Sequence, residues 1–264
     1  MTVFDLTGRK ALVTGGAQGL GEGMAHALAR AGAHVVVADV QEDLGAKVAE
    51  SLGGDHGFVR LDVTDDANWE SAVAEATGLL GGLDIVVNNA GVEITSLLVD
   101  LDPDQVRKQL EVNLLGTSLG IKHAFRAMRP GGVAGQGGTV INVASVAATI
   151  AFPGIAVYSA TKSGVDRLTR VAAMESGKLG YGVRVNCIYP GLVPTAMGMG
   201  LASDCAGIGL FGSVEEAVGA VIELTPSGRL GEVADMADAV VFLASDAARF
   251  VNGAGLPVDG GMGM

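Results

Sequence analysis

Short, mostly apolar runs alternate along the chain with longer segments of helical periodicity. The runs at residues 10–14, 34–38, 58–63, 83–87, 139–145, 182–188 and 256–259 predict buried strands. The segments at residues 20–31, 41–52, 67–80, 102–128, 159–173, 213–224 and 232–245 predict helices. Strands and helices that alternate at this spacing favour an α/β class, with helices on both faces of one doubly wound parallel sheet of about seven strands.

Nothing along the chain marks a repeat, a linker or a second domain, so we expect a single domain over residues 1–264. The regular pattern loosens after residue 192. Residues 197–211 are rich in Gly, Met, Ala and Leu, follow no clear period and carry Asp204 as their one charge. Because long irregular connections often serve as lids over ligand sites, residues 194–228 are predicted to cover such a site.

Composition narrows the classes of partner. The net charge is −12, which argues against binding to nucleic acid or to anionic membranes. The two cysteines, Cys187 and Cys205, have no metal-site spacing, and we expect no metal. The N-terminus lacks an apolar signal core and no apolar stretch reaches the about 18 residues that span a bilayer, so a cytoplasmic location is expected.

A glycine-dense turn follows the first predicted strand. Gly15, Gly19 and Gly21 permit a tight turn and a close approach of backbone to a ligand, and the helix that begins near Leu20 directs free N–H groups at the same point. Asp39 ends the second strand, about 20 residues further on, where an acid accepts hydrogen bonds from a ribose. Strand, glycine turn, helix, strand and acid together predict a dinucleotide site.

The same segment predicts which dinucleotide binds. Asp39 can accept hydrogen bonds from both ribose hydroxyls, whereas it repels a 2′-phosphate. The positions at which a basic residue would receive that phosphate hold Gln18 and Val40. We therefore expect NAD(H) in preference to NADP(H).

A second cluster of candidate residues lies after the fifth predicted strand. Ser145 ends that strand, at the sheet edge where open α/β folds bind ligands. Tyr158 and Lys162 are four residues apart and share one face of a helix. An ammonium beside a phenol favours the phenolate, which suits proton transfer coupled to hydride transfer. The alternative is an ordinary amphipathic pair on a solvated helix, and the motif by itself does not decide between the two.

With these residues placed, the chain resembles the short-chain dehydrogenase/reductase family over almost its whole length. The motifs that carry the resemblance, in the family's order and approximate spacing, are Thr14-Gly15-x-x-x-Gly19-x-Gly21, Asp62-Val63, Asn88-Asn89-Ala90-Gly91, Asn113, Ser145, Tyr158-x-x-x-Lys162 and Pro190-Gly191. The resemblance implies a single-domain Rossmann fold.

The resemblance also implies roles for four catalytic residues. Tyr158 is the general acid/base, and Ser145 holds the substrate oxygen. Lys162 binds the nicotinamide ribose and lowers the pKa of the tyrosine, while Asn113 supports a water relay to Lys162. Taken alone, Asn113 among apolar neighbours is explained as well by a satisfied structural amide; its place in the full set of motifs favours catalysis.

Further residues are expected to contact the cofactor. By resemblance, Asp62 and Val63 meet the adenine, and Val193 and Thr195 hold the nicotinamide amide and the diphosphate. The other residues expected to bind the cofactor are Gly15, Gln18, Gly19, Leu20, Gly21, Asp39, Val40, Asn89, Ala90, Gly91, Tyr158, Lys162, Pro190 and Gly191.

The function that these residues predict is hydride transfer between NAD(H) and a secondary alcohol or ketone. One alternative is a 3-oxoacyl-thioester reductase, against which Asp39 and the acidic charge argue, because that enzyme normally prefers NADPH and an acidic carrier. The other is a non-catalytic dinucleotide-binding protein, which has no reason to combine Asn113, Ser145, Tyr158 and Lys162.

The expected substrate is bulky, neutral and apolar, such as a cyclic alcohol or a hydroxysteroid-like compound. Residues 146–152 and 197–211 are almost free of charge, so a carboxylate or phosphate would find no partner there. The alternative is that these side chains only pack the lid against the body. The residues expected to contact the substrate are Ser145, Val146, Phe152, Tyr158, Met197, Met199 and Leu201.

Two predicted helices carry apolar residues over an unusually wide arc. They are residues 106–128 and 159–173, and helices of this kind need burial on more than one side. The resemblance implies that they pair between subunits in a homotetramer. The alternative is that the additional apolar area belongs to the core of one subunit.

Overall fold

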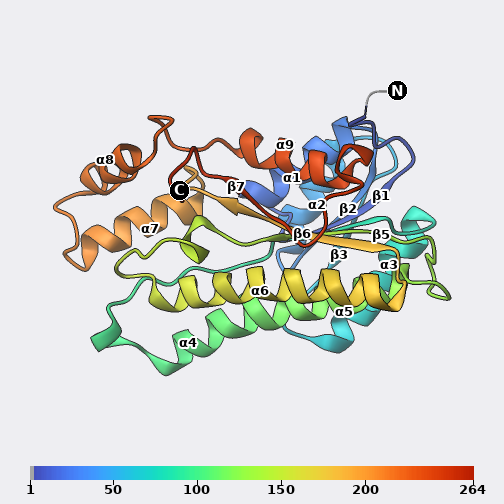
Figure 1. Cartoon of the computed structure of the whole chain (residues 1–264), viewed down its shortest axis with the longest axis horizontal. Coiled ribbons are helices and arrows are strands. Elements are labelled where there is room, and N and C mark those ends of the chain that lie inside the picture. The colour runs from blue at the N-terminus through green and yellow to red at the C-terminus, as the bar shows by residue number, and fades with distance from the viewer. Residues whose placement is uncertain (1–2) are drawn as a thin grey trace.

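A seven-stranded parallel sheet forms the centre of the structure (Figure 1). The computed structural model describes residues 3–264. The strands are β1 (Lys10–Thr14), β2 (His34–Asp39), β3 (Gly57–Arg60), β4 (Ile85–Asn88), β5 (Gly138–Val143), β6 (Val183–Pro190) and β7 (Gly255–Val258). They lie in the order β3-β2-β1-β4-β5-β6-β7, and each neighbouring pair is parallel. The predicted fold class is confirmed.

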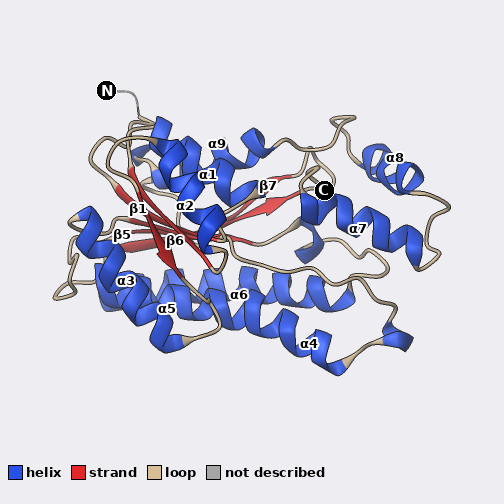
Figure 2. Ribbon diagram, turned by 180° about the vertical axis from the view of Figure 1, so that it is seen from behind, coloured by secondary structure: helices blue, strands red, loops and turns tan. Residues whose placement is uncertain are grey.

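Helices cover both faces of the sheet (Figure 2). One layer holds α1 (Gly19–Arg30), α2 (Glu42–Leu52) and α9 (Val233–Ala244), and the other holds α3 (Asp66–Leu80), α4 (Pro103–Gln109), α5 (Gly116–Met128) and α6 (Ala156–Leu179). The helices α7 (Ala196–Gly207) and α8 (Val214–Leu224) lie together at one end, near the C-terminus (Figure 1). Within residues 3–264, no helix has the length and apolar character needed to cross a membrane.

The order of the strands opens a crevice beside β1. This strand pairs with β2 on one side and with β4 on the other, so the winding of the chain reverses between them. In open α/β sheets, ligands bind outside the carboxyl ends of the strands at such a reversal. The glycine turn follows β1 and Asn89 follows β4, so the topology brings both to this point.

Two predicted elements are shorter or less regular than expected. β3 ends at Arg60, because the Asp62 side chain accepts hydrogen bonds from the backbone N–H and the hydroxyl of Thr64 and turns the chain. The helix predicted over residues 102–128 begins as expected, with the Asp102 side chain capping it at Asp104 N. It then passes through a π-helical stretch, Leu110–Leu115, which the periodicity did not predict.

The expectation of an irregular connection over residues 197–211 is wrong. Most of this segment forms α7, and the Thr195 hydroxyl caps its first turn by accepting a hydrogen bond from Gly198 N at 3.3 Å. The exposed positions of this helix hold Ala, Met and Gly as well as Ser203 and Asp204, so no continuous polar face marks its period in the sequence.

Candidate active site

The glycine turn after β1 depends on the backbone freedom of its glycines and on hydrogen bonds to the Thr14 hydroxyl. Gly15 and Gly19 have φ angles of +62° and +60°, a region that side chains disfavour. The Thr14 hydroxyl accepts hydrogen bonds from the N–H groups of Asn89 and Ala90, both at 3.1 Å, which ties the turn to the end of β4. A Cβ atom on Gly21 would lie 2.1 Å from the carbonyl oxygen of Gly15. Gly21 is therefore required by the packing of α1 against its own turn.

Asp39 fastens this turn from the other side. Its Oδ2 atom accepts a hydrogen bond from Ala17 N at 3.1 Å, and its Oδ1 atom accepts one from Gln41 N at 3.0 Å. The side chain also lines the cavity described next. Asp39 thus shapes the turn as well as presenting a carboxylate to a ligand.

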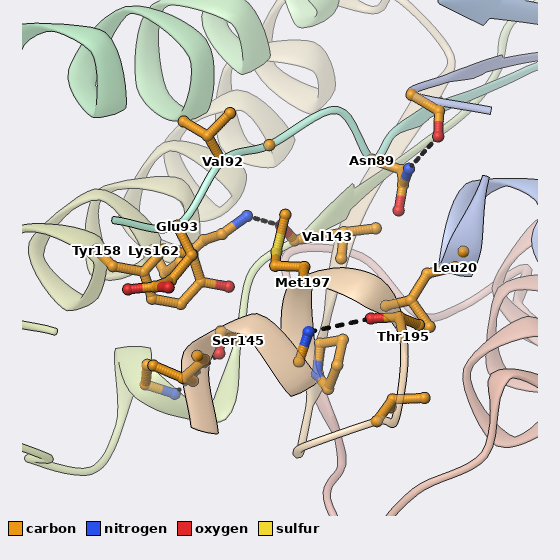
Figure 3. Close-up of a pocket in the computed structure, with 18 of the residues that line it drawn as sticks. Leu20, Asn89, Val92, Glu93, Val143, Ser145, Tyr158, Lys162, Thr195 and Met197 are labelled. Atoms are coloured by element: carbon orange, nitrogen blue, oxygen red, sulfur yellow. Dashed lines mark hydrogen bonds between the residues drawn. The ribbon is translucent and has the colours of Figure 1, made fainter. Parts of the chain in front are cut away.

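A cavity of about 800 Å³ joins the two predicted sites. Figure 3 shows Leu20, Asn89 and Thr195 at one end, and Glu93, Tyr158 and Lys162 at the other. Of the residues predicted for cofactor, substrate and catalysis, those that line it are Gly15, Gln18, Gly19, Leu20, Asp39, Val40, Asp62, Val63, Asn89, Ala90, Gly91, Ser145, Val146, Phe152, Tyr158, Lys162, Pro190, Gly191, Val193, Thr195, Met197 and Leu201.

Three predicted residues lie outside this lining. Gly21 is buried in the turn, and Asn113 is completely buried. Met199 does not reach the cavity, because residues two apart on a helix point to different sides. Met197 and Leu201, which are four apart, both face the cavity. That Met199 contacts the substrate stays a prediction, made for a segment that is helical in the structure.

Tyr158 and Lys162 project from the first turns of α6, as their spacing predicts. The Lys162 ammonium donates a hydrogen bond to the carbonyl oxygen of Val143 at 2.8 Å and lies 5.6 Å from the centre of the Tyr158 ring. Ser145 follows β5, and its hydroxyl accepts a hydrogen bond from Ala147 N at 3.1 Å. The three side chains therefore meet at the carboxyl end of β5.

The pKa of Tyr158 is set mainly by burial. Burial raises the pKa of its hydroxyl to about 12, with Ser145 acting in the opposite direction and Glu93 in the same one. Burial lowers the pKa of Lys162 to about 8. Loss of solvent around the phenol outweighs its hydrogen bond with Ser145. That Lys162 lowers the pKa of the tyrosine stays a prediction.

Asn113 is fully bonded by its side chain. Oδ1 accepts a hydrogen bond from Val92 N, and Nδ2 donates to the oxygen of Val92 and to the Thr161 hydroxyl, at 2.8, 2.8 and 3.0 Å. It lies in the π-helical stretch, where the additional residue of the turn directs it inward. These contacts join α6 to the loop after β4.

Comparison with known proteins places this geometry in a family. A family model described as "Enoyl-(Acyl carrier protein) reductase" matches residues 15–263. The chain belongs to the short-chain dehydrogenase/reductase family. It is an oxidoreductase that acts on a secondary alcohol or the corresponding ketone and uses a nicotinamide dinucleotide.

Three relatives of this short-chain dehydrogenase/reductase span nearly its whole length. A trans-4-hydroxycyclohexanecarboxylate dehydrogenase of Sinomonas cyclohexanicum is 38% identical over 95% of this chain and 91% of its own. A 2,5-dichloro-2,5-cyclohexadiene-1,4-diol dehydrogenase of Sphingobium indicum is 35% identical over 97% and 98%. The crystal structure of a gluconate 5-dehydrogenase from Burkholderia cenocepacia, in complex with NADP and tartrate, is 35% identical over 98% and 96%, with a TM-score of 0.87. The relatives are enzymes, which sets aside a non-catalytic protein.

The cavity of this family member has hydrogen-bond donors suited to the phosphates of a dinucleotide. The first N–H groups of α1 border the cavity at Gly19 and Leu20, and among residues 3–264 no side chain caps them at Gln18. Free N–H groups at a helix N-terminus bind phosphate, and the Asp39 carboxylate lines the same end. No cluster of three or more His, Cys, Asp or Glu side chains in that part of the chain is arranged to hold a metal ion.

Several lining residues were not predicted from the sequence. Met262 reaches the cavity because Asp259 accepts hydrogen bonds from Gly261 N and Gly263 N, both at 2.9 Å, and bends the C-terminal tail. Glu93 lies two positions after Gly91, and a carboxyl so close to a predicted site was the one available signal. The other unpredicted residues of the lining that concern the substrate are Val92, Ile150, Ile155, Cys205, Phe211 and Val221.

Proposed function

We propose that this chain oxidises a neutral cyclic secondary alcohol to its ketone, with NAD as the hydride acceptor. The observation that carries the proposal is the wall around Ser145 and Tyr158. It is apolar over most of its extent and includes Phe152 and Phe211, whose rings stack with centroids 6.3 Å apart. A flat apolar wall of this kind suits a carbocycle. Two relatives named for cyclohexane or cyclohexadiene compounds support a six-membered ring, and the one named for a diol also supports a neutral substrate.

The chain supplies the proton chemistry of the reaction. The bound nicotinamide would accept or return the hydride at the carbinol carbon. Ser145 donates a hydrogen bond to the substrate oxygen and holds it beside the Tyr158 hydroxyl oxygen, which takes the proton during oxidation and returns it during reduction. Because the pKa of Tyr158 is raised, the phenol begins reduction in the protonated form that it needs. For oxidation, the ammonium of Lys162 favours the phenolate once the ribose is bound beside it.

The proposal assigns NAD on the basis of Asp39. Its carboxylate lines the cavity, and a 2′-phosphate at this point would meet a negative charge. Gln18 and Val40, which flank the same end, offer no positive charge. The gluconate 5-dehydrogenase binds NADP, so the choice needs a direct measurement.

We assign the remaining predicted residues by their position. The N–H groups of the glycine turn bind the diphosphate, and Asp62 and Val63 contact the adenine. Val193 and Thr195 hold the nicotinamide amide and the diphosphate, and Asn113 positions the loop at Val92 and supports a water relay to Lys162.

One panel of substrates tests both choices. Cyclohexanol, a hydroxysteroid, an aryl alcohol, gluconate and a 3-hydroxyacyl thioester are each offered with NAD and with NADP. The expected result is the highest kcat/KM for cyclohexanol or the steroid with NAD. The highest value on gluconate would overturn the substrate, and an equal or higher value with NADP would overturn the cofactor. Preference for the thioester would instead establish the acyl-thioester reductase.

The proposal includes a lid over residues 194–228. In support, α7 and α8 lie over one end of the cavity, and Met197, Leu201, Ala217 and Val221 from these helices line it. Both helices pack against each other, so we expect them to move as a pair. The rest of the chain forms with them a single catalytic domain.

We also propose a cytoplasmic homotetramer. In one subunit the outer faces of α6 and the π-helical stretch expose large apolar side chains, namely Leu110, Leu115, Val171 and Met174. Exposed apolar patches of this kind mark contacts between proteins. Cys187 and Cys205 are both free thiols, which agrees with a reducing compartment. Light scattering at micromolar concentration is expected to give four times the mass of one chain, and a monomeric mass would contradict the assembly.

A further inference from the structure

The Glu93 carboxyl lies beside the reacting groups and forms no ion pair with any residue of the part of the chain that the structure describes. It follows β4 by a short loop and lines the cavity at the end where Tyr158 and Lys162 lie (Figure 3). The Thr95 hydroxyl donates a hydrogen bond to its Oε1 atom at 3.0 Å. Among residues 3–264, Oε2 receives no hydrogen bond from the protein, so one carboxyl oxygen is left for a ligand.

The ionisable groups around Glu93 include one cation, the Lys162 ammonium, which lies at the same end of the cavity and donates its hydrogen bond to Val143 (Figure 3). The others are Asp204 and Cys205 on α7 and Tyr158 on α6. Burial raises the pKa of Glu93 to about 7, Asp204 acts in the same direction, and the hydrogen bond from Thr95 acts against both. Ionising a carboxyl in such surroundings costs free energy. A carboxyl with a raised pKa that lines a cavity beside reacting groups is a candidate for a function. The assigned proton chemistry runs through Tyr158 and does not employ Glu93.

We propose that Glu93 is a specificity-determining residue, whose free carboxyl oxygen accepts a hydrogen bond from a second hydroxyl on the ring of a cyclic diol. The proposal deepens the proposed function and rests on it. It predicts that a cyclohexane-1,4-diol binds better than cyclohexanol, and that a ring carboxylate binds worse than the diol. The two cyclohexane-type relatives differ in this respect, since one is named for a diol and the other for a hydroxy acid.

The reason for the preference is the geometry of a ring held at two points. Ser145 and Tyr158 hold the reacting oxygen, and Glu93 lies to one side of them at the same end of the cavity. A hydroxyl in reach of Glu93 gains a charge-assisted hydrogen bond. A carboxylate in the same place meets the like charge of Glu93 in apolar surroundings.

Binding to the whole enzyme, saturated with NADH to form a dead-end complex, tests the proposal without turnover. Isothermal titration at pH 8 with cyclohexane-1,4-diol, cyclohexanol and trans-4-hydroxycyclohexanecarboxylate gives three dissociation constants. The diol is expected to bind about 10-fold more tightly than cyclohexanol, because it gains one hydrogen bond to a charged group. Lowering the pH to 6 protonates Glu93 and is expected to favour the hydroxy acid relative to the diol.

Two substitutions separate the hydrogen bond from the charge. Glu93→Leu removes the acceptor and is expected to abolish the preference for the diol over cyclohexanol. Glu93→Gln removes the charge alone and is expected to improve binding of the hydroxy acid about 10-fold. Glu50→Gln, on the exposed side of α2, makes the same change of charge away from the cavity and should leave all three constants unchanged.

Equal binding of diol and cyclohexanol by the wild type, or a preference that survives Glu93→Leu, overturns the role of Glu93. Titration of NADH confirms that each variant is folded and binds its cofactor. Oxidation of the same compounds is followed in parallel. If the wild type shows the binding preference and oxidises none of them, the role of Glu93 stands and the proposed function fails.

Discussion

The two ends of the cavity are built in different ways. The nucleotide end consists largely of backbone, in the glycine turn, the first N–H groups of α1 and the chain after β4. The substrate end consists of side chains that come from α6, α7, α8, the loop after β4 and the C-terminal tail. Backbone donors at the first end serve any ligand with the same phosphates, whereas the side chains at the second set the shape and charge of one substrate.

This difference predicts how each end responds to change. A backbone cradle has no side chain to exchange, so a substitution there disturbs its geometry and the binding of cofactor together. A wall of side chains can be altered one residue at a time, with the sheet and the cofactor left in place. Tyr158 lies at the substrate end and carries the transferable proton, so its loss should affect turnover far more than the binding of the cofactor (Figure 3).

The largest effect is expected for Tyr158→Phe, which removes the transferable proton and little volume. We expect kcat to fall by about 10²–10⁴-fold, the usual contribution of general acid–base catalysis. Cofactor affinity, measured by titration of NADH fluorescence, should remain as in the wild type. Tyr181→Phe, on a ring that packs against Phe125, serves as the matched control. Turnover near the wild-type rate would remove Tyr158 from its assigned role.

A smaller but broader effect is expected for Gly21→Ala at the nucleotide end. The new Cβ would lie 2.1 Å from the carbonyl oxygen of Gly15, so the turn has to move. Overpacking of this kind destabilises by about 1–3 kcal/mol, and the displaced turn should also bind NAD more weakly. Thermal unfolding and NADH titration measure the two.

The control for this change is Gly78→Ala in α3, where an added Cβ meets no atom within 4 Å. Alanine is a better helix former than glycine by up to about 1 kcal/mol, so this variant should be slightly more stable and bind NAD normally. Equal behaviour of the two variants would contradict the close packing of the glycine turn.

At the substrate end, Phe211→Ala should change selectivity alone. The ring stacks on Phe152, and its loss opens the apolar wall. We expect kcat/KM for cyclohexanol to fall about tenfold while the dissociation constant of NADH is unchanged. Phe250→Ala, at a fully exposed ring, is the control. A change in cofactor affinity in Phe211→Ala would mean that the two ends are coupled.

The smallest effect concerns stability and Glu93. Its pKa in the folded chain is raised to about 7 from 4.5, so between these values the unfolded chain ionises first and the folded state loses stability as the pH rises. The Glu93→Gln variant cannot ionise at this position, so it does not lose stability in this way as the pH rises. The variant should match the wild type near pH 4.5 and have a higher Tm above pH 7. A difference in Tm that does not vary with pH would contradict the raised pKa.

The sequence was sufficient for the parts of the site that local patterns encode. Gly15, Gly19 and Asp39 follow strands that the apolar runs predict, and a parallel sheet brings the ends of such strands together. The spacing of Tyr158 and Lys162 fixes their common face on a helix. These features depend on the period of the helix and on the φ angles that glycine can adopt. Both are local properties of the backbone and do not change with the segments that pack against it.

Only the tertiary structure decided the substrate end. Nothing local shows that Glu93 and Asp204 lie near one another, that Met262 folds back to the cavity, or that Met197 faces inward while Met199 does not. The rise in the pKa of Tyr158 likewise follows from burial by distant segments. The physical reason is that desolvation and side-chain packing depend on which remote parts of the chain meet, whereas strand, turn and helix depend mainly on neighbours in the sequence.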